Sequence, residues 1–123
     1  MPDATEIVVV EQRMDRAGLA RLVRGGFGDM VKVVVDLSRA VAAVGGQLHA
    51  DGEAELLGRG SQQADLWGAN YYPGRGLEAC VEYTALINIR PADDNPGMEI
   101  SDAALRARVR QIVVALLGEG EPL

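Results

Sequence analysis

The sequence has one cysteine, one histidine and one lysine, and each shortage excludes a class of protein. With Cys80 as the only cysteine, no internal disulfide can form, which favours a reducing, cytoplasmic location. No apolar run reaches the roughly 18 to 20 residues that span a bilayer, because Lys32 and Asp36 interrupt the most apolar region. A basic start followed by an apolar stretch and a cleavage site is also missing, so we expect no signal peptide.

Strong catalytic motifs are missing as well. The sequence contains no phosphate-binding loop, no dinucleotide fingerprint, no Cys-x-x-Cys, no His-Glu-x-x-His and no Gly-x-Ser-x-Gly. A single histidine without a neighbouring serine or cysteine disfavours a hydrolytic triad, and Cys80 is typical of a strand residue rather than a nucleophile. These patterns therefore predict no cofactor and no bound metal.

What remains is an acidic chain of ordinary globular composition, 48% hydrophobic and 24% charged. The formal net charge is −6 and the sequence pI is about 4.7. Because phosphate groups and anionic bilayers attract Lys and Arg, this charge disfavours nucleic-acid and membrane partners. With 123 residues, one domain over 1–123 is expected, with residues 118–123 as a frayed tail.

Hydrophobic periodicity predicts eight elements in the order β-α-β-β-α-β-β-α. The expected strands cover 6–10, 30–36, 40–44, 65–72 and 80–90, the last being the longest. The expected helices begin at Asp15, at about Asp51 and after an N-cap at Ser101. The fold class that follows is α+β, a two-layer, about five-stranded mixed sheet with three helices mainly on one face.

The densest group of side chains able to do chemistry near neutral pH is His49, Asp51 and Glu53. An extended segment would put all three on one side, whereas a helix would align only His49 and Glu53. Either geometry lets a carboxylate orient the imidazole as a base, or holds a metal ion. The structural alternative is an N-cap at Asp51, a helix-dipole acid at Glu53 and a histidine bonded to a backbone carbonyl.

Two further segments carry candidate binding groups. Asn88 and Arg90 end the expected last strand, where a guanidinium can bind a carboxylate or phosphate through two hydrogen bonds, or simply pair with a nearby acid. Asp65, Trp67 and Asn70 belong to an aromatic-rich strand that suits a ligand wall, an interface or plain core packing. Gly68 inside that strand predicts a bulge or the close approach of another backbone.

Three segments together resemble a known family. They are 45–51 (GGQLHAD), 65–73 (DLWGANYYP) and 87–91 (INIRP). The combination resembles a family of short bacterial proteins of unknown function, over about residues 27–117. The resemblance implies no activity, substrate or cofactor.

The leading hypothesis is a small protein with one polar cleft that binds an anionic or amide-bearing metabolite. The sequence leaves open whether the protein is an enzyme that hydrolyses or lyses this molecule. The acid/base groups of the cleft would be His49, Asp51 and Glu53, and its ligand-binding groups Asp65, Trp67, Asn70, Asn88 and Arg90. The alternative is a non-enzymatic protein-interaction module, such as a homodimer, which the −6 charge and the aromatic cluster favour.

Overall fold

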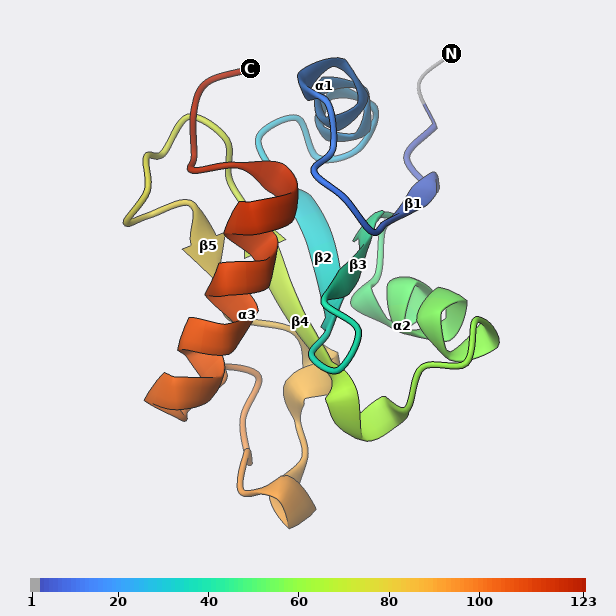
Figure 1. Ribbon diagram of the computed structural model, residues 1–123, viewed down its shortest axis with the longest axis vertical. Coiled ribbons are helices and arrows are strands. Elements are labelled where there is room, and N and C mark those ends of the chain that lie inside the picture. Colours follow the sequence, from blue (N-terminus) through green and yellow to red (C-terminus); the bar gives the residue numbers. More distant parts are fainter. Residues whose placement is uncertain (1–2) are drawn as a thin grey trace.

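Five strands form one open sheet in the order β1-β3-β2-β4-β5, and three helices pack against it (Figure 1). The computed structural model describes residues 3–123. The strands are β1 (Ile7–Val10), β2 (Val31–Asp36), β3 (Val41–Gly45), β4 (Leu66–Tyr71) and β5 (Val81–Glu82). The helices are α1 (Arg16–Gly25), α2 (His49–Gly58) and α3 (Ala103–Leu117), with short 3-10 turns η1 (Gln63–Asp65), η2 (Leu86–Asn88) and η3 (Pro91–Asp93). The α+β class, the five strands, the three helices and their order are those that the sequence predicts.

Every pairing in the sheet is antiparallel, whereas the sequence analysis expected a mixed sheet. The difference arises at β3, which forms a hairpin with β2 and also pairs with β1. Val44 of β3 lies opposite Val33 on one side and Val8 on the other. β1 and β2 therefore run in the same direction, but β3 separates them and no parallel ladder forms.

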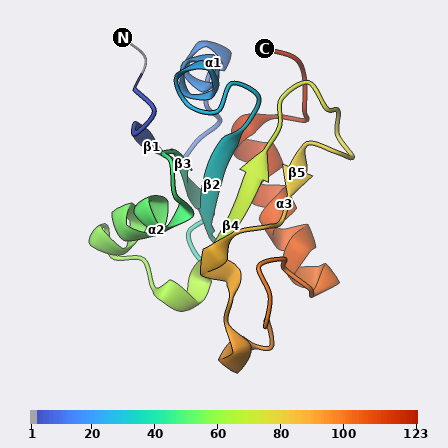
Figure 2. The same cartoon turned by 180° about the vertical axis from the view of Figure 1, so that it is seen from behind.

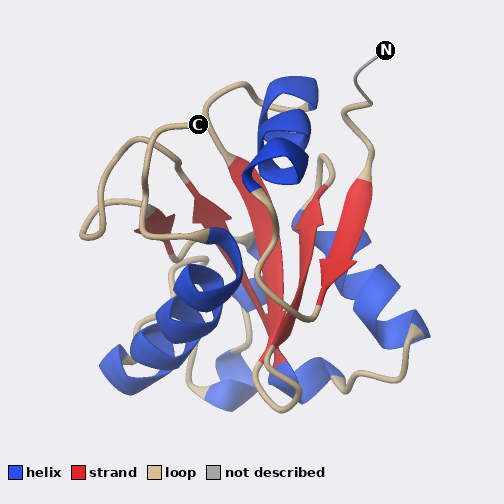
Figure 3. Cartoon of the chain, turned by 45° about the horizontal axis from the view of Figure 1, so that its top comes forward, coloured by secondary structure: helices blue, strands red, loops and turns tan. Residues whose placement is uncertain are grey.

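Helices cover both faces of the sheet, so the architecture has a third layer beyond the two expected. α1 and α3 share one face and α2 lies on the other (Figure 3). Figure 2 shows the sheet from behind, with α3 on its far side. The reason lies in β2, where Val33 and Val35 face α1 and α3 while Val34 faces α2. A strand that is apolar on both sides needs cover on both.

The helix starts agree only in part with the expected caps. Asp15 caps α1 by accepting a hydrogen bond from the Gly18 amide at 2.8 Å, as expected. The cap of α3 is Asp102 rather than Ser101, because the Asp102 carboxylate accepts from Leu105. α2 begins at His49 after Leu48, which has no side-chain oxygen and makes no cap hydrogen bond.

The segment 80–90 is not the long strand that the sequence predicts. Only Val81–Glu82 pairs with β4, after which the chain bridges at Thr84, turns through η2 and bridges again at Arg90. The expected alternation of faces therefore fails beyond Glu82. The physical reason is the side chain of Asn88, which takes the place of a strand partner by bonding to both backbone groups of Gly68.

The last residues, expected to fray, are hydrogen-bonded to the rest of the fold. The Gly120 amide donates to the Tyr71 hydroxyl at 2.8 Å, and the Gly120 carbonyl accepts from the amides of Gly74 and Gly76. The tail thereby covers the end of β4.

Candidate functional site

A pocket of about 320 Å³ opens on the α2 face of the sheet, between the start of α2 and the segment 84–87. Its polar lining is Lys32, His49, Asn70 and Thr84, and its apolar lining includes Leu48, Leu86, Ile87 and Met98. Lys32 on β2 and Asn70 on β4 are direct partners in the sheet register. The pocket is therefore mostly apolar with a few convergent polar groups, which is the usual composition of a small-molecule site.

His49 is the first residue of α2 and is only 6% exposed. Its Nε2 lies 2.8 Å from the carbonyl oxygen of Ala69. A carbonyl only accepts, so Nε2 carries the proton and Nδ1 keeps its lone pair. Burial lowers the pKa of His49 to about 4, the charge of Lys32 acts in the same direction, and the hydrogen bond to the Ala69 carbonyl and the nearby Asn70 side chain act against it. The imidazole is thus neutral at pH 7 and bonded to the backbone.

Gly68 lets the walls of the pocket approach β4. A Cβ atom at this position would lie 2.5 Å from Cβ of Ala85 and 3.2 Å from Cδ2 of His49. Both contacts are closer than packed carbon atoms allow. Gly68 is therefore a site of close approach, but side chains from two segments approach it rather than the other backbone that the sequence predicted.

Asn70 carries a buried hydrogen-bond acceptor without a partner. The side chain is 6% exposed, and its Nδ2 donates to Oε1 of Glu82 at 2.8 Å and to the carbonyl of Thr84 at 3.3 Å. No donor within residues 3–123 reaches its Oδ1. An unsatisfied buried polar atom costs about 1–3 kcal/mol, so a ligand that donates a hydrogen bond here would gain affinity.

Asn88 replaces a strand partner for β4. Its Oδ1 accepts from the Gly68 amide at 2.8 Å, and its Nδ2 donates to the Gly68 carbonyl at 2.9 Å. A third bond, at 3.2 Å, reaches the carbonyl of Met98. One fully buried side chain thus satisfies both backbone groups of Gly68, and the chain is free to turn through η2 instead of continuing as a strand.

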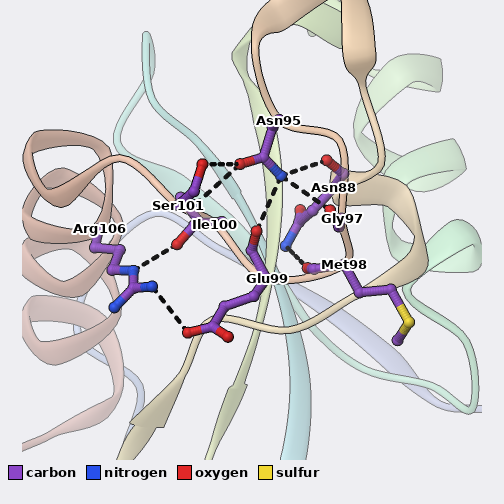
Figure 4. Close-up of polar contacts among 8 residues, drawn as sticks. All are labelled: Asn88, Asn95, Gly97, Met98, Glu99, Ile100, Ser101 and Arg106. Carbon is purple, nitrogen blue, oxygen red and sulfur yellow. Dashed lines mark hydrogen bonds and ion pairs between the residues drawn. The ribbon is translucent and has the colours of Figure 1, made fainter.

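Asn95 holds together the loop that follows (Figure 4). Its Nδ2 donates to the carbonyls of Asn88, Gly97 and Glu99, and its Oδ1 accepts from the amide and hydroxyl of Ser101. This network fixes the segment that brings Met98 to the pocket. Asn95 is not among the site residues predicted from the sequence. An available signal was the asparagine itself, whose amide commonly bonds to nearby backbone in turns.

Arg90 lies at the end of the sheet and contacts backbone rather than carboxylates. Its Nε donates to the carbonyl of Ile87 and its two terminal nitrogens donate to those of Gln63 and Leu66. The guanidinium carbon lies 4.2 Å from the centre of the Trp67 ring. Burial lowers the pKa of Arg90, and the charge of Glu53 is the larger of two opposing effects. Within residues 3–123 no carboxylate oxygen comes within 4.0 Å of it.

The predicted site residues therefore fall into separate places. His49 and Asn70 line the pocket together, whereas Trp67 belongs to the core on the opposite face of the sheet. The remaining candidates lie outside the pocket lining: Asp51 is exposed, Glu53 and Asp65 are half-buried, Asn88 is in the scaffold, and Arg90 borders a second pocket. Sequence reasoning missed Lys32 as a pocket residue, although a lone lysine inside an apolar strand was a usable signal.

The part of the chain that the structure describes has neither a metal-binding cluster nor a membrane-spanning helix. No three His, Cys, Asp or Glu side chains of residues 3–123 come together as a metal ion would need. Nor does any helix in the same range have the length and apolar character to cross a bilayer.

The fold and the pocket define a small α+β protein built on an antiparallel five-stranded sheet. The chain belongs to the family described as "Protein of unknown function (DUF5674)", which matches residues 8–116. This match confirms the resemblance seen in the three sequence segments. No curated protein and no solved structure matches the chain. The family brings no activity, so the function has to be argued from the pocket.

Proposed function

We propose that this protein binds a small organic molecule in the pocket between α2 and η2. The observation that carries the proposal is Asn70, which lines the pocket and whose buried Oδ1 has no donor within residues 3–123. Folded proteins satisfy most buried polar atoms, and an exception calls for an explanation. A bound molecule with an N–H or O–H group supplies that explanation.

Binding is better supported than hydrolysis or lysis. A general base works best when its pKa is near the working pH, and burial lowers that of His49 to about 4. Neither Asp51 nor Glu53 lines the pocket, so no carboxylate of that cluster orients the imidazole there. His49 then serves as a wall and a positioning group that anchors the start of α2 to β4.

A second candidate function is docking of a protein partner on the same surface. Leu48, Leu86 and Met98 are 57%, 68% and 42% exposed, and all three line the pocket. Exposed apolar side chains gathered at one place are typical of interaction sites. In this case a side chain of the partner, such as one from a second copy, would enter the pocket.

The test of small-molecule binding is a fragment screen followed by two-dimensional NMR of the labelled protein. We expect hits to shift the backbone amides of 48–50 and 84–86 together with the side-chain amide of Asn70. Ala50→Trp should block the pocket, because Ala50 lines it from an exposed position of α2. Ala54→Trp, on the same helix outside the lining, is the matched control. The proposal fails if no fragment shifts these signals at millimolar concentration.

Light scattering tests the docking alternative. If two copies meet at the pocket, wild type should be a dimer and Leu86→Ser a monomer. Leu77→Ser is the control, since Leu77 is also exposed but does not line this pocket. A wild-type monomer at high concentration would remove the homodimer.

A further inference from the structure

We infer that the ligand of the pocket is an apolar carboxylate with a hydroxyl or amide hydrogen-bond donor, and that Lys32 is its counter-charge. This inference rests on the proposed small-molecule binding and specifies its chemistry. Three features of the pocket carry it: an unpaired ammonium, a helix start without a cap and the acceptor of Asn70.

The ammonium group is the first feature. Lys32 is the only lysine of a chain that has 18 acidic side chains, yet no carboxylate within residues 3–123 lies within 4.0 Å of it. Its Nζ lies 5.4 Å from the centre of the Phe27 ring. The residue is half-buried and lines the pocket. A partly desolvated charge without an opposite charge is costly, so an anion in the pocket would be favoured.

The start of α2 is the second feature. Leu48, His49 and Ala50 line the pocket, and Leu48 at the N-cap position has no side-chain oxygen to accept from the first turn. Free amides at a helix N-terminus carry a partial positive charge and attract anions. These amides lie on the same pocket wall as His49. Because His49 is neutral, it does not compete with them for an anion. The helix start and Lys32 therefore favour the same sign of charge.

Asn70 is the third feature, and it narrows the class of anion. Lys32 and Asn70 are opposite each other in the register, a position where the Cβ atoms of neighbouring strands lie about 4.5–5.5 Å apart. A bare carboxylate would pair with Lys32 but place its oxygens near the unsatisfied Oδ1 of Asn70. A molecule with a hydroxyl or amide N–H one or two bonds from the carboxylate satisfies both groups. The apolar remainder of the ligand would contact Leu86 and Met98.

Two acidic side chains lie near the site. Asp51 is in the first turn of α2, where it offsets part of the helix-end charge, but it is exposed and lies outside the pocket lining. Glu82 accepts hydrogen bonds from Nδ2 of Asn70 at 2.8 Å and from the Tyr72 hydroxyl at 3.2 Å. Both donors face its carboxylate, and it does not line the pocket. Its charge would still weaken the binding of an anion through space. Glu82→Gln should therefore raise the affinity for carboxylates about twofold at low ionic strength, a modest effect typical of an exposed charge.

The experiment uses 2-hydroxy acids with branched, linear and aromatic side chains as probes. Each is compared with the same acid lacking the 2-hydroxyl group (the deoxy acid) and with its primary amide, by NMR titration of the whole chain. We expect the hydroxy acid to bind best, the deoxy acid to bind several-fold more weakly and the neutral amide about tenfold more weakly. Lys32→Met, which keeps the apolar stem, should reduce the affinity of the acids about tenfold and leave that of the amides unchanged. Lys32→Arg should restore binding of the acids.

The outcomes separate this inference from the proposed function. If amides bind as well as acids, or if Lys32→Met leaves the affinity of the acids unchanged, the ligand is not an anion held by Lys32. If none of the acids binds while neutral fragments shift the pocket signals, the inference fails and small-molecule binding stands. If neither acids nor fragments bind, both fail.

Discussion

The two faces of the sheet differ in how completely they are closed. On the face of α1 and α3, valines of β2 such as Val33 and Val35 join Val109 and Val113 in one continuous core. On the face of α2 the buried apolar cluster within residues 3–123 contains only Val34, Ala43, Leu56 and Leu66. Beyond this cluster the surface opens into the pocket. One face therefore supplies most of the apolar burial, which leaves the other able to carry polar groups for binding.

Two buried polar side chains on the α2 face sharpen the contrast. The Asp36 carboxylate accepts hydrogen bonds from the amides of Ser38 and Arg39 and from the Ser61 hydroxyl. It is 1% exposed and fully partnered, as structural polar groups are. Asn70 is buried to a similar degree but its acceptor has no partner within residues 3–123. Asp36 is thus satisfied by the fold alone, whereas Oδ1 of Asn70 is the acceptor that the proposed ligand would satisfy.

The largest effect should come from Asn88→Ala. The change leaves the amide and carbonyl of Gly68 and the carbonyl of Met98 without their partner. At about 1–3 kcal/mol for each unsatisfied buried group, we expect a loss of about 4 kcal/mol in the free energy of unfolding, measured by urea denaturation. Gln111→Ala, at an exposed position of α3, is the control. A loss below about 1 kcal/mol would show that water can replace Asn88.

Arg90→Ala should have the next largest effect. It removes hydrogen bonds to three backbone carbonyls and the contact with Trp67, at about 3 kcal/mol in total. For a domain of this size that lowers the melting temperature by about 10 °C. Arg90→Lys should recover little, because an ammonium cannot reproduce the planar fork. Arg108→Ala, at an exposed site of α3, is the control. An unchanged melt would instead mean that Arg90 is held for a ligand.

Lowering the pH should have a smaller effect on the free energy of unfolding, through the protonation of His49. Burial lowers its pKa from 6.5 to about 4, so between these values the unfolded chain binds a proton that the folded chain does not. The free energy of unfolding is therefore constant with respect to this group above pH 6.5 and falls as the pH drops toward 4. The expected loss from pH 7 to pH 5 is about 2 kcal/mol.

Urea denaturation of wild type and His49→Gln at pH 7 and pH 5 measures this loss in the free energy of unfolding. Because His49 is the only histidine, the difference between the two proteins isolates its contribution. An equal loss in both would mean that the imidazole is as accessible to protons in the folded chain as in the unfolded one, which contradicts its burial on the α2 face.

The same contrast explains what the sequence could and could not predict. The elements predicted correctly have local sequence signals, such as α1 with its cap at Asp15 and the strands β2 and β3. Gly68 was recognised as a site of close approach, but the sequence predicted a backbone there and the structure places side chains. The role of Asn88 depends on a partner 20 residues away, and alternation alone made 80–90 a strand. Long-range polar contacts of this kind leave no periodic signal.

Site residues were predicted from chemical type, and the fold sorted them by face. Trp67 and Asn70 lie three residues apart on β4, so strand alternation puts them on opposite faces of the sheet. The two side chains therefore do not line one cleft together. Lys32 looked like an interruption of an apolar strand. Its place in the pocket follows from its register partner Asn70, and only the pairing of β2 with β4 reveals that partner.

The smallest effect on stability should come from Leu86→Ser, at the apolar rim of the pocket. Leu86 is 68% exposed, and substitutions at exposed sites usually change the free energy of unfolding by less than about 0.5 kcal/mol. The control Leu77→Ser, also exposed, should be equally neutral. A loss above about 1 kcal/mol for Leu86→Ser alone would show that the rim supports the fold. A neutral result, together with weaker binding of apolar probes to Leu86→Ser alone, would mean that this leucine contributes to recognition and not to the core, which is the division of labour that the two faces of the sheet imply.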